Sequence, residues 1–259
     1  MLRTRVIPVL LLKNAGLVKT QQFKNPKYVG DPINAVRIFN DKEVDELVFL
    51  DISATPNKRK PNFELIRDIA TEAFMPFGYG GGITTINDIE KLFKIGVEKV
   101  ILNTAVFENP KLITEATEIF GSQSIVASVD VKKTFFNAKK VITNCGKKKV
   151  RVNYIEYVKK LEQFGVGEIV INSIDNDGMA QGYDLELIKQ ISGAVNIPVV
   201  ALGGAGSVED FQRAIKQGGA SAVAAGSMFV FNGPHRAVLI SYPKYDDLET
   251  KITQKNDKG

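Results

Sequence analysis

An apolar stretch at residues 45–52 (DELVFLDI) has a second copy at residues 167–174 (GEIVINSI), so that Glu168 corresponds to Glu46 at an offset of 122 positions. A glycine-rich stretch repeats at the same offset, where the counterparts of Gly81-Gly82, Thr85, Asp88 and Gly96 are Gly203-Gly204, Ser207, Asp210 and Gly218. A single offset that holds over successive elements indicates an internal duplication. We therefore predict a chain of two similar halves.

Short apolar runs alternate with amphipathic stretches along the chain, as in repeated β-strand and α-helix units around a parallel sheet. We expect strands at residues 5–12, 46–52, 76–79, 99–102, 125–130, 168–172, 198–202 and 220–224. We expect helices at residues 62–73, 85–95, 110–120, 154–164, 185–192 and 208–217, most of them followed closely by a glycine that can end a helix. The predicted fold is an α/β protein of one domain, a (β/α)8 barrel of two half-barrels at residues 1–121 and 122–245.

Three segments stand outside this pattern. Residues 132–151 alternate polar and β-branched side chains around a glycine-lysine turn, which predicts an inserted hairpin after the fifth strand. Residues 246–259 are expected to form a polar tail with frayed last residues. The apolar run at residues 6–12 is too short to span a membrane and lacks a cleavage site, so we interpret it as the first strand.

The composition narrows the possible functions. With 34 basic and 29 acidic residues, a net charge of +5 indicates a surface of mixed charge, and none of the signatures of nucleic-acid-binding modules is present. Cys145 is the only cysteine and His235 the only histidine, which excludes an internal disulfide and a Cys/His metal cluster. We expect a cytosolic protein without a metal or cofactor, compatible with phosphorylated small molecules.

Barrels of this kind carry their active sites in the loops that follow the strands. Residues 79–84 and 202–207 are glycine-rich loops of this type, and glycine lets backbone N–H groups approach a phosphate at a helix start. Each loop precedes another segment at the same rim. We predict two phosphate sites, and hence a ligand with a phosphate at each end, formed by Gly81, Gly82, Asn103 and Thr104 and by Gly203, Gly204, Gly226 and Ser227.

Polar residues at other strand ends are candidates for proton transfer. Asp130 ends the fifth strand, where a carboxylate inside a barrel is costly unless it is used or paired. Asp177 and Asp175 follow the sixth strand, although Asp175 and Asp51 fit a capping or turn role equally well. Lys19, expected in the loop after the first strand, binds an anion, orients a reacting group or is a solvated lysine.

The first half lacks a counterpart of Asp130. Alignment of the two halves at an offset of 119 places Leu11 opposite this aspartate. A two-acid mechanism that uses both halves is therefore excluded.

Four charged residues occupy comparable places at the starts of strands one, two, four and six. Each by itself fits a solvated residue at the barrel rim. Together, two bases and two acids could instead close a ring across the barrel bottom that gates a passage; these residues are Arg5, Glu46, Lys99 and Glu168.

Over nearly its whole length the chain resembles the cyclase subunit of imidazole glycerol phosphate synthase. The most specific segments are residues 45–52, 80–83, 103–105, 173–178 and 203–206. The resemblance implies that a glutaminase subunit docks at the amino-end face of the barrel in a heterodimer. Ammonia would cross the barrel and attack a bisphosphorylated intermediate of histidine synthesis. It also implies that the charged residues form the ammonia gate, that the two Gly-Gly segments form the phosphate sites, and that the active site includes Lys19, Asp130 and Asp177.

One position departs from the family pattern. The family's catalytic aspartate at the end of strand one falls on Leu11, and loss of an acid–base group typically removes about 10²–10⁴-fold in rate. The opening at residues 5–13 and residues 16–20 look like a paralogous branch that accompanies a glutaminase and an ATP-dependent sugar amidotransferase in surface-polysaccharide assembly. There the barrel would pass ammonia onward for conversion of an acetamido sugar to its amidine.

Four hypotheses follow. The leading one is an ammonia-channelling subunit of a sugar-amidating complex, and the second is a working cyclase of histidine synthesis in which another group replaces the missing acid. The third is a non-catalytic activator of the glutaminase. The fourth, an aminoaldose–ketose isomerase of the same pathway, also requires an acid where Leu11 stands.

Overall fold

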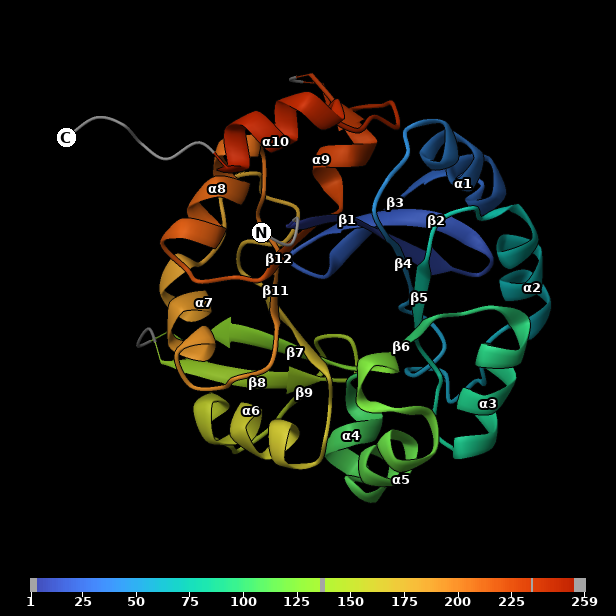
Figure 1. The fold of residues 1–259 in the computed structure, drawn as a ribbon, viewed down its shortest axis with the longest axis vertical. Helices are drawn as coiled ribbons and strands as arrows, with labels where there is room; N and C mark the ends of the chain where they lie inside the picture. Colours follow the sequence, from blue (N-terminus) through green and yellow to red (C-terminus); the bar gives the residue numbers. More distant parts are fainter. Residues whose placement is uncertain (1–3, 136–137, 234, 254–259) are drawn as a thin grey trace.

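The computed structural model describes residues 4–135, 138–233 and 235–253. Its centre is a closed barrel of eight parallel strands, viewed in Figure 1 with helices around it. The barrel closes because β10 pairs with both β11 and β7. This confirms the predicted (β/α)8 fold; its strands are β1 (Arg5–Lys13), β4 (Leu47–Asp51), β5 (Phe77–Gly80), β6 (Lys99–Leu102), β7 (Ile125–Lys133), β10 (Glu168–Ser173), β11 (Val199–Leu202) and β12 (Ala222–Ala225).

The helices begin and end at the signals expected from the sequence. In α3, a capping box of Thr85 and Asp88 starts the helix, and Gly96 ends it with a φ of 116°. The outer helices are α1 (Pro32–Asp41), α2 (Phe63–Glu72), α3 (Ile86–Ile95), α5 (Lys111–Phe120), α6 (Tyr154–Gln163), α7 (Leu185–Ser192) and α8 (Val208–Lys216). Shorter elements are α4 (Thr104–Glu108), η1 (Ser122–Ser124), α9 (Ser227–Val230), β13 (Phe231–Asn232) and β14 (Ala237–Val238).

Two of the longer helices, and the short helices α4 and α9, were not predicted. Helix α1 follows an Asp31 N-cap and buries Phe39 against the core. Its buried residues Pro32, Ala35, Val36 and Phe39 have helical spacing, so the signal was available in the sequence. Helix α10 (Tyr245–Thr253) occupies part of the expected polar tail, packs on α8 and buries Leu248 and Ile252. The last residues, which we expected to be frayed, lie outside the described part of the chain.

The core has two parts. The larger part lies between the barrel and its helices. The smaller part fills the barrel with aliphatic side chains, which include Ile7, Val9, Val48, Ile101, Val126, Val200, Leu202, Ala222 and Ala224. The barrel interior is therefore mostly apolar.

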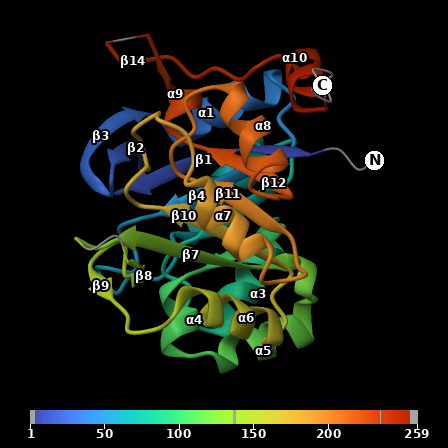
Figure 2. The same cartoon turned by 90° about the vertical axis from the view of Figure 1, so that its left-hand side faces the viewer.

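Hairpins extend two opposite strands of the barrel. The predicted insertion is confirmed, because β8 (Lys139–Thr143) pairs antiparallel with β7, and β9 (Lys148–Lys149) pairs with β8. A matching extension after β1, formed by β2 (Gly16–Gln21) and β3 (Lys24–Gly30), was not expected. Both project from the same end of the barrel, at the left-hand side of Figure 2.

Candidate functional site

A cavity of about 420 Å³ opens at the carboxyl end of the barrel. It brings together nine of the eleven residues predicted for catalysis and phosphate binding, from strands and loops of both halves. They are Lys19, Gly81, Gly82, Asn103, Thr104, Asp130, Asp177, Gly226 and Ser227. Gly203 and Gly204 do not line it. Instead, the Gly204 carbonyl accepts a hydrogen bond from the N–H of Gly182, so the loop after β10 covers this segment.

Asp130 is buried in the wall of the cavity at the carboxyl end of β7. Its two oxygens accept hydrogen bonds from the side-chain amides of Asn103, at 2.9 Å, and Asn172, at 3.3 Å. Burial raises the pKa of Asp130 to about 7; the Asn172 bond opposes this shift and the nearby charge of Asp177 reinforces it. The group can therefore donate or accept a proton near neutral pH.

Lys19 and Asp177 form a second buried pair of titratable groups. Lys19 lies in β2, rather than in a loop, and its ammonium donates to the Val9 carbonyl beside Gly226. Burial lowers the pKa of Lys19 to about 8, against the opposing charge of Asp177. Burial likewise raises the pKa of Asp177 to about 6, opposed by the charge of Lys19. The cavity thus holds three groups whose pKa values lie close to neutrality.

The raised pKa of Asp130 predicts a dependence of stability on pH. Between its usual value of 3.8 and about 7, the folded chain keeps a proton that the unfolded chain loses, so stability falls as the pH rises. Asp130→Asn carries no charge and should escape this loss. We compare the unfolding free energies of Asp130→Asn and the wild type. The difference between them should shift in favour of the variant by on the order of 2 kcal/mol between about pH 5 and about pH 8. Urea denaturation at both pH values measures it, and an equal effect at both would contradict the prediction.

The first Gly-Gly segment is held close to its neighbours. Gly81 has a φ of 121°, and a Cβ there would lie 2.4 Å from the Asp51 carbonyl oxygen. Gly82 donates its N–H to the Thr55 hydroxyl at 3.1 Å. Glycine is therefore required here by the backbone conformation and the packing, and a phosphate-binding role for this segment remains a prediction.

The two aspartates for which we also considered a turn role make local hydrogen bonds. One oxygen of Asp51 accepts from the N–H groups of Ser53 and Ala54. Asp175 accepts from the N–H of Lys133, which joins the loop after β10 to the end of β7. Both therefore shape the rim.

Among the cavity residues for which no role in the site was predicted, two carry side chains of chemical interest, Asn172 and Cys145. Asn172 lies opposite Asp130 in the pairing of β10 with β7, and its side-chain oxygen is buried without a partner in the described structure. The sequence signal was available, since this amide replaces Leu50 of the first half within an apolar strand. Cys145 also lines the cavity, but burial raises its pKa to about 12, which makes the thiol a poor nucleophile.

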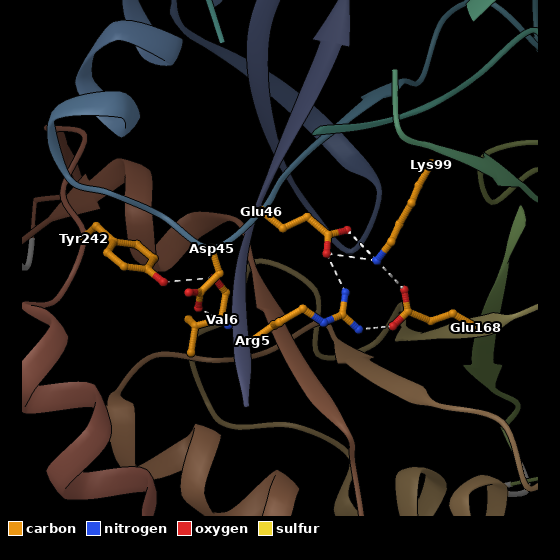
Figure 3. Close-up of polar contacts among 7 residues, drawn as sticks. All are labelled: Arg5, Val6, Asp45, Glu46, Lys99, Glu168 and Tyr242. Atoms are coloured by element: carbon orange, nitrogen blue, oxygen red, sulfur yellow. Dashed lines mark hydrogen bonds and ion pairs between the residues drawn. The ribbon is translucent and has the colours of Figure 1, made fainter. Parts of the chain in front are cut away.

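A closed ring of ion pairs lies at the amino end of the barrel (Figure 3). Arg5 contacts both Glu46 and Glu168, and the Lys99 ammonium bridges the same two carboxylates at 2.9 and 3.0 Å. The glutamates are 6 and 8% exposed, whereas Arg5 is 31% exposed. Burial alone would lower the pKa of Arg5, but the bonds and charges of the two glutamates outweigh burial and raise it.

A small internal cavity lies between this ring and the large cavity. Its volume of about 20 Å³ fits one molecule of the size of water or ammonia. Glu46, Lys99 and Glu168 line one end, and the walls are mostly aliphatic. Five residues border both cavities, namely Val9, Leu50, Ile101, Ser128 and Leu202. The internal cavity therefore adjoins the site that holds Asp130.

Fold and site together define a (β/α)8-barrel protein whose candidate acid–base groups lie at the carboxyl ends of its strands. The chain belongs to the family of histidine biosynthesis proteins, since the model of that family matches residues 5–234.

Relatives of the chain carry the name expected from its motifs. One from Pseudomonas aeruginosa, named "Putative imidazole glycerol phosphate synthase subunit hisF2", is 53% identical over 249 residues, which cover 96% of this chain and 99% of that protein. The "Putative imidazole glycerol phosphate synthase subunit hisF3" of Vibrio vulnificus is 52% identical, covering 94% of each chain. "Imidazole glycerol phosphate synthase subunit HisF" of a Hydrogenobaculum species is 41% identical, covering 97% of this chain and 100% of that protein. The resemblance to this cyclase subunit is confirmed.

Proposed function

We propose that the chain is an ammonia-conducting subunit of a glutamine amidotransferase complex. A glutaminase would dock at the amino end of the barrel, over the ring of Arg5, Glu46, Lys99 and Glu168. Ammonia would pass the ring, cross the barrel and leave through the carboxyl-end cavity. An ATP-dependent partner would activate the carbonyl oxygen of an acetamido sugar, and ammonia would replace that oxygen to give the amidine.

The observation that carries this proposal is a contrast: the position of a catalytic acid is occupied by Leu11, whereas the residues suited to conducting ammonia are retained. Leu11 lines the same large cavity as Asp130, but it cannot exchange a proton, so the cavity lacks an acid at the end of β1, where the family pattern places a catalytic aspartate. The features that conduction needs are present, because aliphatic walls adjoin the ring and suit a neutral molecule. The same aliphatic walls would exclude the ammonium ion, whose burial is costly.

A second candidate function is the cyclase reaction of histidine synthesis. It is favoured by the convergence of Lys19, Asp130 and Asp177 in one cavity, and by the names of the relatives. In that case one of these groups, or a neighbouring acid, would take over the role of the missing aspartate.

Reconstitution with the glutaminase and the sugar amidotransferase tests the proposal. We expect glutamine-driven amidation to require the barrel, whereas amidation driven by an ammonium salt should proceed without it. The yield of amidinated sugar, measured by mass spectrometry with each nitrogen source, gives the answer. Glutamine-driven amidation at the same rate without the barrel would refute conduction. Stimulation of the glutaminase that persists when Lys99 and Glu168 are altered to block the passage would instead indicate a non-catalytic activator.

A further inference from the structure

Three segments at the carboxyl end of the barrel carry basic side chains and no acidic ones. They are the β2–β3 hairpin (residues 16–30), the loop after β4 (residues 53–62) and the β7–β9 insertion (residues 131–151). They hold 3, 3 and 8 of the 34 basic residues and none of the 29 acidic residues. The composition predicted a surface of mixed charge, but the fold gathers these segments at one end, on the left-hand side of Figure 2. We call them together the basic face.

The basic face is wider than the cavity that it surrounds. Strands β1 and β7 are four positions apart in the barrel of eight, so the two hairpins lie on opposite sides of the mouth (Figure 1). Lys13, Lys19 and Lys147 line the cavity, whereas Lys24 and Lys140 are exposed outside it. A small molecule within the cavity cannot contact both of these outer lysines. A macromolecule that lies across the mouth can.

In the insertion, lysines of β7 lie directly opposite lysines of β8. Lys133 and Lys139 are opposite each other in the pairing of β7 with β8, and both contact Asp184. Lys132 and Lys140 are also directly opposite, but in the described structure no acidic side chain pairs with them. Like charges at such positions destabilise a strand pair. An anionic surface laid over this hairpin would relieve the repulsion.

Apolar side chains are exposed next to these charges. Tyr28 of β3 is 65% exposed, and Val238 and Leu239 are 45 and 53% exposed. The two groups are neighbours, because the Lys27 ammonium lies 5.5 Å from the centre of the Phe231 ring in the β13–β14 hairpin. Apolar residues beside charged ones are typical of a protein interface, and two of these three residues, Val238 and Leu239, are aliphatic and offer no stacking surface to nucleic-acid bases. The mixture favours a protein.

We propose that the basic face, with Tyr28, Val238 and Leu239, docks an acidic surface of the ATP-dependent enzyme that accepts the ammonia. This inference rests on the proposed function. Such a partner would cover the cavity mouth, so that ammonia passes from the barrel to the acceptor without entering solvent. The opposite charges would also accelerate association and fix the orientation of the two proteins.

Charge reversal on each side of the mouth tests the proposal. The variants are Lys24→Glu with Lys27→Glu, and Lys140→Glu with Lys149→Glu; the control reverses two exposed lysines on the outer helix α6, Lys159→Glu with Lys160→Glu. Binding to the purified sugar amidotransferase is measured by calorimetry at low and high potassium chloride. We expect each double variant to weaken binding about tenfold or more at low salt and to flatten the salt dependence, with the control unchanged.

If the lysines of the insertion had only a structural role, their reversal should lower stability and leave binding unchanged. Lys140→Glu turns a like-charge pair into an ion pair, so we expect its melting temperature to stay the same or rise while its binding weakens. A lower melting temperature together with unchanged binding would overturn the proposal. The proposal would also be overturned if the wild-type chain bound single-stranded oligouridine in a salt-dependent manner but did not bind the amidotransferase.

Coupled amidation separates failure of this inference from failure of the proposed function. If the wild-type barrel supports glutamine-driven amidation and the reversals do not reduce it, the docking face is wrong and conduction stands. If the wild type supports none, both are wrong. The result that supports docking is a loss of glutamine-driven amidation in the two reversal variants alone, with ammonium-driven amidation unchanged in every variant.

Discussion

Leu11→Asp is expected to convert a chain with background cyclase activity into a slow cyclase. Leu11 lies at the carboxyl end of β1, is partly buried and lines the same cavity as Asp130. An aspartate there would stand in similarly apolar surroundings, which would raise its pKa towards neutrality and let it exchange a proton. An acid–base group of this kind typically contributes about 10²–10⁴-fold, so a gain of at least about a hundredfold over the wild type is expected.

The assay uses the bisphosphorylated ribulosyl intermediate with excess ammonium salt at alkaline pH, which removes any need for a glutaminase. The product, imidazole glycerol phosphate, is measured. Leu11→Asn is the matched control, since asparagine has nearly the same size as aspartate but its amide does not act as an acid or a base. Adding Asp130→Asn to Leu11→Asp should abolish the new activity, because both acids are then required. A cyclase-like rate in the wild-type chain would refute the reading of Leu11 as a lost catalytic group.

Glu168→Ala is expected to uncouple glutamine hydrolysis from use of the ammonia. Glu168 is the only carboxylate besides Glu46 that contacts both Arg5 and Lys99 in the described ring. Its loss leaves two cations with one carboxylate, which opens the ring to water. We expect the amidinated product per glutamine hydrolysed to fall about tenfold, a change of about 1.4 kcal/mol in the partition of ammonia.

The same substitution should also lower stability. Removal of one partner of a buried ion pair costs about 3–5 kcal/mol, and the partial exposure of Arg5 and Lys99 reduces the expected cost to about 2–3 kcal/mol. Glu98→Ala is the control, because Glu98 is exposed beside Lys99 and outside the ring. Glu168→Gln keeps the side-chain volume and isolates the loss of charge. If coupling is unchanged in both Glu168 variants, the ring does not gate ammonia.

The sequence alone was sufficient for the barrel, because each unit carries local signals. Apolar strand runs, the Thr85–Asp88 capping box and the glycine after α3 are read from neighbouring residues, and the constant offset between the halves joins these units into one fold. Helix α1 was missed although it carries local signals, namely the Asp31 N-cap and apolar residues at helical spacing. Helix α10 was missed because its burial depends on an element that precedes it by about 30 residues. Helix α10 is mostly polar, and it packs against α8, with Leu248 buried.

The sequence also determined which residue types stand at the strand ends, including the leucine where an acid was expected. Only the tertiary structure decided how they combine. Burial brings the pKa values of Asp130 and Lys19 towards neutrality, and this depends on packing from both halves. Strand order brings Arg5 to Glu168, which is 163 residues away. Basic residues of three separate segments gather in one basic face, because parallel strands send the loops that follow them to the same end of the barrel.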